Sequence, residues 1–416
     1  MLFASFSPAC AIGNDEPFIT RKKINIIDAE FGLRSVILTT PIKLTDMKRR
    51  KLLAYSATGA VTTASLAACT QETSGQSTAT SSALPTVRWK MATSWPTSLD
   101  TLYGAATEVA DRVEAMTDGR FTIEVFAGGE IVPGLQVLDA VQAGTVECGH
   151  TASYYYIGKN PALVFGTTVP FGLNAQQQYA WLYHGGGREM MNKLYADFNI
   201  IGFPAGNTGV QMGGWFKNQV KTVDDLNGLK MRIPGFGGKV LASLGVNVQV
   251  LPGGEIFLAL ERGAIDAAEW VGPYDDEKLG LNKAAEFYYY PGWWEPGSTF
   301  DLQVNLDQWN KLPAEYQQIL EAAASESNLQ CWSRYDARNP QALKRLKESG
   351  TQLKPFSREI LTACRDKTTE LLDQQASESA EFKEVYESWK QFREDIFNWH
   401  QVSELGYGSF AMGSLA

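Results

Sequence analysis

The sequence predicts an α/β protein in which two lobes, each built on a mostly parallel sheet, face each other across a cleft. Strand and helix patterns alternate in two separate stretches, residues 87–151 and 221–271, and this alternation is typical of parallel sheets with helices on their faces. The chain has 416 residues, more than the roughly 250–300 at which a single core stops growing. Two lobes are therefore the simpler architecture.

The first stretch contains three strand patterns separated by two helix patterns. Apolar residues alternate with polar ones along the strands and recur every three or four positions along the helices. Strands are expected at residues 87–95, 121–126 and 145–151, and helices at residues 99–116 and 136–143. This order implies a parallel sheet.

The second stretch repeats this order and ends on a carboxylate followed by a tryptophan. Strands are expected at residues 229–233, 246–251 and 264–271, a helical turn at residues 223–228, and helices at residues 238–244 and 254–262. Glu269 and Trp270 lie at the end of the last strand, just before Gly272 and Pro273. Ligands of open α/β sheets bind beyond the carboxyl ends of strands, so this strand end is a candidate site.

Beyond about Leu312 the pattern is helical almost throughout, and its last part carries an aromatic stripe. Residues 381–399 place six apolar side chains on one helical face: Phe382, Val385, Tyr386, Trp389, Phe392 and Ile396. Such a stripe is expected to be buried against another surface. The pattern does not decide whether that surface belongs to the same chain or to a second subunit.

The N-terminal part has the form of a bacterial export signal. Residues 47–68 run from a basic cluster through a short apolar segment to small residues, and Arg49-Arg50 resembles a twin-arginine signal. Cys69 then stands where a lipoprotein would be acylated, with cleavage near an Ala-x-Ala stretch as the alternative. Residues 69–86 are rich in Ser, Thr and Gln and suit a flexible tether. Residues 1–46 are expected to lie upstream of the true start at Met47.

Composition excludes several functions. The net charge of −9 and pI near 5.1 disfavour binding to nucleic acid or to anionic membranes. The five cysteines and three histidines show no zinc-site spacing. Nucleophile-elbow, metalloprotease and phosphate-loop motifs are missing as well, so enzymatic function has little support.

Two polar residues are candidates for binding an anion. Arg232 ends a strand, and a guanidinium can hold a carboxylate by two parallel hydrogen bonds. Gln211 lies among glycines that permit close approach of a ligand. A surface ion pair for Arg232 and a local turn for Gln211 remain open from these residues alone.

Four carboxylates flanked by aromatic residues are candidates for a cation site. They are Glu269, Asp275, Asp276 and Glu295. Hard cations take such oxygen ligands, but Glu269 and Glu295 could also be the acid/base pair of a secreted carbohydrate-active hydrolase. Asp275 and Asp276 fit the acidic cap of a helix that follows Pro273.

Several motifs resemble one known family. GNTGVQMGGWFKN, LNGLKMRIPGFGGKVLASLG, VQVLPGGEIFLALERGAIDAAEWVGPYDDEKLGL and YYYPGWWEPG resemble the substrate-binding protein of tripartite ATP-independent periplasmic (TRAP) transporters. Within that family they are similar to the branch that binds 2-oxo and 2-hydroxy monocarboxylates with a metal ion. The resemblance covers residues 87–412 and implies a two-lobed periplasmic binding protein with mixed, mostly parallel sheets, crossing hinge strands, a long helix and a helical C-terminal tail.

The resemblance also implies roles for individual residues. Arg232 matches the arginine that holds the substrate carboxylate, and Gln211 matches a glutamine that contacts substrate and metal. The metal ligands are implied to be Glu269, Trp270, Glu295 and Gln211, and calcium and sodium both suit these oxygens. Trp270 is also implied to contact the substrate. On the opposite lobe, three aromatic residues are implied to line the site: Trp95, Tyr154 and Tyr155.

The implied function is that of a periplasmic receptor for pyruvate-like 2-oxoacids, which it delivers to the small and large membrane subunits of a TRAP permease. Residues 87–210 are expected to form mainly the first lobe, residues 211–296 mainly the second, and residues 297–416 the crossover, the helical part and a C-terminal helix that pairs two subunits. Receptors for dicarboxylates or amino acids are the alternatives within the binding class.

Overall fold

The structure, a computed structural model, describes residues 84–413. The expected start at Met47, the export signal at residues 47–68 and most of the tether at residues 69–86 lie outside the described residues. Within residues 84–413 no helix is long and apolar enough to cross a membrane.

The first lobe contains a five-stranded sheet in the order β2-β1-β3-β10-β4. Its strands are β1 (Val87–Thr93), β2 (Phe121–Phe126), β3 (Cys148–Thr151), β4 (Ile200–Asn207) and β10 (Thr299–Asn305). The first three strands are parallel, as expected from the alternation, whereas β10 runs antiparallel to both of its neighbours. Strand β10 arrives from the second lobe.

The second lobe contains a six-stranded sheet in the order β11-β9-β5-β8-β6-β7. Its strands are β5 (Trp215–Phe216), β6 (Lys230–Arg232), β7 (Asn247–Gln249), β8 (Ala267–Ala268), β9 (Phe287–Tyr290) and β11 (Gln352–Pro355). Strand β8 is parallel to β6, and β5 runs antiparallel between β8 and β9. The mixed sheets, two lobes and helical C-terminal region confirm the predicted fold class.

Two details of the second lobe differ from the predicted elements. The strand expected at residues 264–271 is only two residues long, so Glu269 and Trp270 follow β8 instead of lying within it. Strand β11, within the region predicted as helical, pairs with β9. Pairing with a distant strand selected an extended conformation there, and a local helical pattern does not report such pairing.

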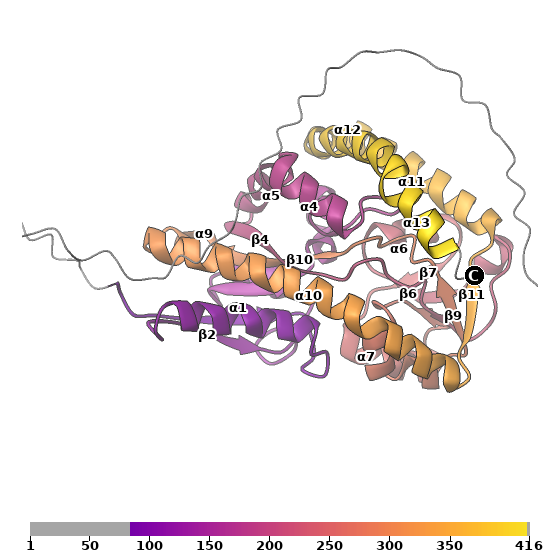
Figure 1. Cartoon of the computed structure of the whole chain (residues 1–416), viewed down its shortest axis with the longest axis horizontal. Coiled ribbons are helices and arrows are strands. Elements are labelled where there is room, and N and C mark those ends of the chain that lie inside the picture. Colours follow the sequence, from indigo (N-terminus) through magenta and orange to yellow (C-terminus); the bar gives the residue numbers. More distant parts are fainter. Residues whose placement is uncertain (1–83, 414–416) are drawn as a thin grey trace, which may run out of the picture. The chain divides into compact units, whose positions relative to one another are not determined.

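Helices cover the sheets and connect the lobes. The helices are α1 (Leu102–Met116), α2 (Val137–Gln142), α3 (Val164–Thr167), α4 (Ala175–His184), α5 (Gly187–Ala196), α6 (Gly235–Ser243), α7 (Gly253–Glu261), α8 (Pro273–Lys278), α9 (Leu306–Trp309), α10 (Ala314–Glu348), α11 (Arg358–Glu378), α12 (Ala380–Val402) and α13 (Glu404–Gly413), with 3-10 turns at η1 (Ser153–Tyr156), η2 (Pro161–Leu163), η3 (Asp224–Leu226) and η4 (Leu281–Lys283). Helix α10, 35 residues long, packs on α1 and β4 of the first lobe and on α8 of the second (Figure 1). A single helix thus spans both lobes.

The aromatic stripe of α12 packs on the chain's own first lobe. The ring of Phe165 lies 5.1 Å from that of Phe382 and 5.7 Å from that of Trp389, measured between ring centres. Phe392 and Ile396 are partly buried against the same core. The sequence left two possibilities for what buries this stripe, and the structure shows that it packs on the same chain. The stripe therefore gives no argument for a second subunit.

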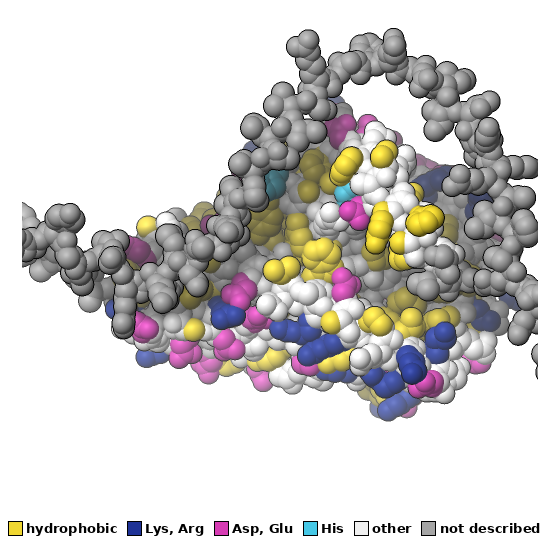
Figure 2. Space-filling view, in the orientation of Figure 1, with side chains coloured by type: hydrophobic (Ala, Val, Ile, Leu, Met, Phe, Trp, Pro, Cys, Tyr) yellow, Lys and Arg dark blue, Asp and Glu magenta, His cyan; other side chains and the backbone are white. Residues whose placement is uncertain are grey.

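A second set of apolar side chains, further along the C-terminal helices, is exposed (Figure 2). We call it the C-terminal apolar surface: Trp399, Val402, Leu405, Tyr407, Phe410 and Met412. Phe410 is the most exposed of these, at 86%.

Candidate functional site

Arg232 and Glu269 meet because they end adjacent parallel strands. Arg232 is the last residue of β6, and Glu269 directly follows the neighbouring β8. The Arg232 Nη1 donates to the Glu269 carboxylate and, at 3.2 Å, to the Glu269 main-chain oxygen. Its Nε donates to the main-chain oxygen of Leu251 at 3.0 Å, and its guanidinium carbon lies 5.1 Å from the ring centre of Trp270. The guanidinium is thereby held in one orientation.

Gln211 and Glu295 meet where the chain crosses between the lobes. Gln211 lies in the segment that joins β4 to β5, and Glu295 lies in the segment that joins β9 to β10. The Gln211 Nε2 donates to Glu295 Oε2 at 2.7 Å, and the Ser298 hydroxyl donates to the same oxygen at 2.6 Å. A Cβ at Gly292 would lie 2.6 Å from the main-chain oxygen of Gln211, so the close approach of the two crossing segments requires glycine there.

The first lobe contributes an aromatic wall opposite these polar residues. Trp95 follows β1, and Tyr154 and Tyr155 lie on η1, with their rings stacked 4.8 Å apart. The Trp95 ring lies 6.5 Å from the Trp270 ring in an edge-to-face arrangement, so the two lobes touch through their tryptophans.

Together these residues enclose a small cavity. It is lined by Trp95, Leu102, Tyr154, Tyr155, Gln211, Arg232, Trp270, Val271 and Phe300, and its volume is about 10 Å³. Such a volume holds about one water molecule. The lobes are therefore closed, and Arg232, at 1% exposure, is sealed from solvent.

Four polar atoms at this site are buried and have no hydrogen-bond partner among residues 84–413. One is Trp270 Nε1, and the other three are Arg232 Nη2, Glu269 Oε2 and Gln211 Oε1. A buried polar group without a partner costs free energy, so these atoms are candidates for contact with a ligand. Arg232 Nη2 can only donate, which suits an anion, whereas Glu269 Oε2 and Gln211 Oε1 accept, which suits a hard cation.

The electrostatics of the two carboxylates also favour a cation. Burial raises the pKa of Glu269 well above its usual range, and Glu295 raises it further, while Arg232 opposes the rise. Burial raises the pKa of Glu295 to about 7, opposed by the hydrogen bond from Ser298. Within residues 84–413 no three His, Cys, Asp or Glu side chains are grouped to hold a metal ion. A cation here would therefore combine carboxylates with amide, main-chain or ligand oxygens, and the residues present fit that requirement.

Asp275 and Asp276 are buried but do not line the cavity. Asp276 Oδ1 accepts from the main-chain N–H groups of Val271 and Gly272 at 3.2 and 3.1 Å, and the Oδ2 of Asp275 accepts from the Tyr335 hydroxyl at 2.5 Å. The prediction of an acidic helix N-terminus is confirmed: both residues lie in the first turn of α8, and Asp276 accepts from the N–H of Gly272, the N-cap residue.

The sequence interpretation missed Ser298, Phe300, Leu102 and Val271. Ser298 follows Glu295 by three residues, a spacing that could have suggested a local hydrogen bond. The three apolar residues carry no local signal, because apolar residues in strands and helices are usually core residues.

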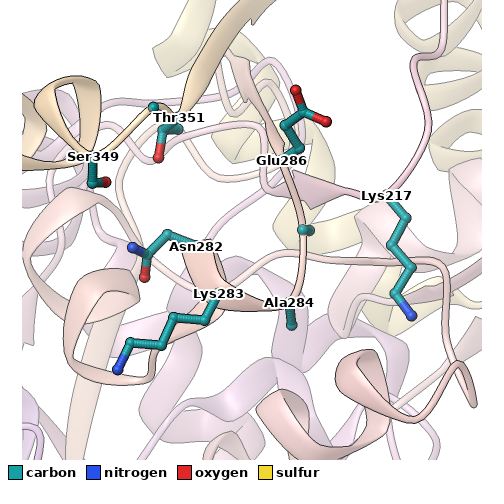
Figure 3. Close-up of a pocket in the computed structure, with 9 residues that line it drawn as sticks. Lys217, Asn282, Lys283, Ala284, Glu286, Ser349 and Thr351 are labelled. Atoms are coloured by element: carbon teal, nitrogen blue, oxygen red, sulfur yellow. The ribbon is translucent and has the colours of Figure 1, made fainter.

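A larger pocket, of about 380 Å³, lies elsewhere on the second lobe and shares no residue with the cavity. Figure 3 shows the Lys217 and Lys283 side chains extending in different directions, and Glu286 pointing away from both. Its charged groups do not converge, so the small cavity is the stronger candidate site.

A known family and a known protein are similar to this chain over most of its length. The family model of the bacterial extracellular solute-binding protein, family 7, matches residues 91–379. A protein of Nostoc sp. (strain PCC 7120), named monocarboxylate 2-oxoacid-binding periplasmic protein, is 63% identical over 368 residues, which are 88% of this chain and 100% of that protein.

Two solved structures are also similar. A TRAP transporter solute-binding protein from Bordetella bronchiseptica, a mixed-occupancy dimer with copurified calcium and picolinate in one active site, is 48% identical, with a TM-score of 0.79 over 80% of this chain and 98% of that one. A TRAP periplasmic solute-binding protein from Pseudoalteromonas atlantica with bound sodium and pyruvate is 40% identical, with a TM-score of 0.75 over 77% of this chain and 98% of that one.

Proposed function

This chain belongs to the bacterial extracellular solute-binding protein family 7, and from that premise we propose that it is the receptor of a TRAP transporter for pyruvate and related monocarboxylate 2-oxoacids. It binds them together with a sodium or calcium ion and delivers them to the membrane permease. The observation that carries this proposal is an unpartnered donor, Arg232 Nη2, beside two unpartnered acceptors: Gln211 Oε1, on a residue that lines the same cavity, and Glu269 Oε2, on the residue that is in an ion pair with Arg232.

Charge balance supports a metal-coupled ligand. The site buries one guanidinium and two carboxyl groups whose pKa values burial raises, so that ionising both of them and adding a monocarboxylate would leave two negative charges uncompensated. Burying unpaired charge is costly. A cation held by Glu269, Gln211, Glu295 and the Trp270 carbonyl would offset that charge and attract the oxo and carboxylate oxygens of the ligand.

The protein's own groups then perform three tasks. Arg232, already oriented by Glu269 and Leu251, donates Nη2 to the ligand carboxylate. Ser298 and Gln211 hold the Glu295 carboxylate in place, and this carboxylate would supply an oxygen to a bound cation. Trp95, Tyr154, Tyr155 and Trp270 exclude water, which strengthens each of these electrostatic contacts.

The lining of the cavity argues against the other candidates. Arg232 is the only Lys or Arg among the lining residues that the structure describes, and a dicarboxylate would need a second positive group. Glu269, the general acid or base of the hydrolase alternative, is instead buried in an ion pair with Arg232. Titration with succinate tests the first point, and binding as tight as that of pyruvate would contradict it.

Calorimetric titration tests the chelation mechanism. Metal-stripped protein is titrated with pyruvate alone, with calcium and with sodium. We expect at least one ion to increase the affinity for pyruvate by about tenfold or more, since each uncompensated buried charge costs well over 1.4 kcal/mol. Equal affinities with and without both ions would overturn the mechanism.

We further propose that two copies pair through the C-terminal apolar surface. Its six side chains are 62–86% exposed, more than scattered surface apolar residues require. The Bordetella relative, 48% identical, forms a dimer in its crystal structure. The sequence predicted a dimer interface on the aromatic stripe of α12, but that stripe packs on the same chain. The interface proposed here is the C-terminal apolar surface instead.

We also propose a periplasmic location, reached through the export signal at residues 47–68, with Cys69 as a lipid attachment point. Mass spectrometry of the native protein tests the start and the anchor. A diacylated N-terminal Cys69 is the expected product, and a peptide spanning Thr45 to Lys48 would contradict a start at Met47.

A further inference from the structure

A buried histidine outside the cavity holds one of its walls. His150, on β3, is 0% exposed and does not line the cavity. Its Nδ1 accepts from the indole Nε1 of Trp95 at 2.7 Å, and its Nε2 lies 3.1 Å from the main-chain oxygen of Ala205, on β4. The imidazole therefore connects the tryptophan wall of the site to a strand two places away in the same sheet.

These two partners fix the chemical form of His150. An indole N–H can only donate and a carbonyl oxygen can only accept. The Nδ1 must therefore be bare and the Nε2 must carry the proton, because any other form places two donors or two acceptors face to face. Burial, which lowers the pKa of His150 to about 4 despite the opposing hydrogen bond to Ala205, keeps the ring neutral near pH 7.

The two tryptophans of the cavity differ in this respect. The Nε1 of Trp270 is buried and has no hydrogen-bond partner among residues 84–413, whereas that of Trp95 is held by His150. The Trp95 ring also packs against Phe300, with ring centres 4.9 Å apart, and lies 6.3 Å from the ring of Tyr155. The Trp95 indole is therefore fixed by a directional hydrogen bond, whereas the Trp270 indole is held by packing and by the Arg232 guanidinium over its ring.

We propose that His150 is a positioning residue that fixes the Trp95 indole and thereby sets the size of ligand the cavity accepts. This inference rests on the proposed function, since it concerns the same cavity. A longer side chain on a 2-oxoacid has to displace a wall, and displacing Trp95 would break its bond to His150 and leave a buried N–H unpaired. The fixed wall thus discriminates in favour of short acids.

Matched variants of His150 separate the two bonds. In His150→Asn the side-chain oxygen can replace the Nδ1 acceptor, while in His150→Gln the side-chain amide can reach the Ala205 oxygen but leaves the indole without its acceptor. His150→Leu removes both groups. The Ser327 hydroxyl, whose shorter bond is to the Ala105 oxygen at 2.7 Å, also lies 3.2 Å from the Ala205 oxygen.

The first measurement is the affinity of the purified protein for pyruvate and for 2-oxohexanoate, with calcium present. We expect His150→Leu and His150→Gln to weaken pyruvate binding by about tenfold and to shift the ratio of the two affinities about fivefold toward the longer acid. His150→Asn restores both values to within about twofold of the wild type. An unchanged ratio in His150→Leu would overturn the proposal, because a merely structural role lowers both affinities alike.

The second measurement does not depend on the ligand. In protein labelled with ¹⁵N-tryptophan, the Trp95 indole N–H is identified by its loss in Trp95→Phe, and its exchange with solvent is followed. We expect slow exchange in the wild type and in His150→Asn, and fast exchange or a shifted resonance in His150→Leu. The same resonance in wild type and His150→Leu would refute the proposal, whereas a wild type that fails to bind pyruvate would refute the proposed function alone.

If His150→Leu does not fold, Trp95→Phe takes its place, because phenylalanine keeps an aromatic wall without the N–H donor. The expected result is the same fivefold shift in the ratio, and an unchanged ratio contradicts the proposal.

Discussion

Arg232 contributes to this protein both as a donor for a ligand and as the counter-charge of Glu269. Its Nη1 is in the ion pair and its Nη2 is unpartnered. Removing one member of a buried ion pair typically costs about 3–5 kcal/mol, because the other charge is left alone. Binding and stability can therefore be separated by changing one partner or both.

We expect Arg232→Met to lose pyruvate binding by about 100-fold or more and to lower the free energy of unfolding by about 3 kcal/mol. The double variant Arg232→Met/Glu269→Gln should recover most of the stability and none of the binding, since no buried charge then lacks a partner. Urea unfolding and calorimetric titration measure the two quantities. Arg345→Met, which breaks an exposed ion pair with Glu277, is the matched control and should change neither. Wild-type affinity in Arg232→Met would disprove the assigned role.

At the scale of elements, a cluster of polar residues joins the two lobes outside the cavity. Asp100, in the loop before α1, accepts from the Tyr274 hydroxyl on α8 at 3.0 Å and is in an ion pair with Lys278 of the same helix. Arg338 on α10 donates to Asp100 at 2.9 Å. The contacts between α8 and Asp100 bridge the two lobes, so we expect them to favour the conformation described here.

We expect Asp100→Ala to weaken pyruvate binding about threefold to tenfold by destabilising the closed conformation, although Asp100 does not touch the cavity. The loss should shrink at high salt, because these side chains are partly exposed. Lys344→Ala, which breaks an exposed pair within α10, serves as control. Small-angle scattering should show a larger fraction of open molecules in Asp100→Ala, and unchanged affinity at low salt would contradict this role.

The C-terminal helices provide the second test at this scale. Leu405→Glu and Tyr407→Glu place charges within the C-terminal apolar surface and should convert the dimer to monomers, as measured by light scattering. Met116→Glu, at an apolar residue of α1 that is 45% exposed, should leave the dimer intact. A wild type that is monomeric at all concentrations tested would exclude this proposal.

For the whole molecule, buried carboxylates predict an unusual dependence of stability on pH. Burial raises the pKa values of Asp275, Glu295 and Asp301 to about 7 and that of Asp276 to about 6. Their ordinary values are 3.8 for Asp and 4.5 for Glu. Between about pH 4 and 7 the folded chain therefore binds more protons at these groups than the unfolded chain does, and stability from them increases as pH falls. His150 acts in the opposite direction, since its pKa falls from 6.5 to about 4.

We expect the melting temperature of ligand-free, metal-free protein to rise by about 2 °C or more from pH 7.5 to pH 5.5, because four carboxyls outweigh one imidazole. Asp301→Asn should reduce this rise, since Asp301 lies outside the cavity and titrates in the same range. Thermal unfolding monitored by circular dichroism gives both values. A melting temperature that falls over this range would show that these carboxyls are ionised in the folded chain.

The sequence by itself determined the fold class and the local half of the site. Arg232 and Glu269 end strands that local alternation reveals, and adjacent parallel strands bring their ends together. The pairing of Gln211 with Glu295, 84 residues apart, was expected only from the family resemblance, because no local period reports it.

The tertiary structure alone decided that Phe165 covers the α12 stripe and that His150 holds Trp95, 55 residues away. Contacts of this kind depend on how the crossing segments and sheets pack, which a pattern of neighbours along the chain does not contain.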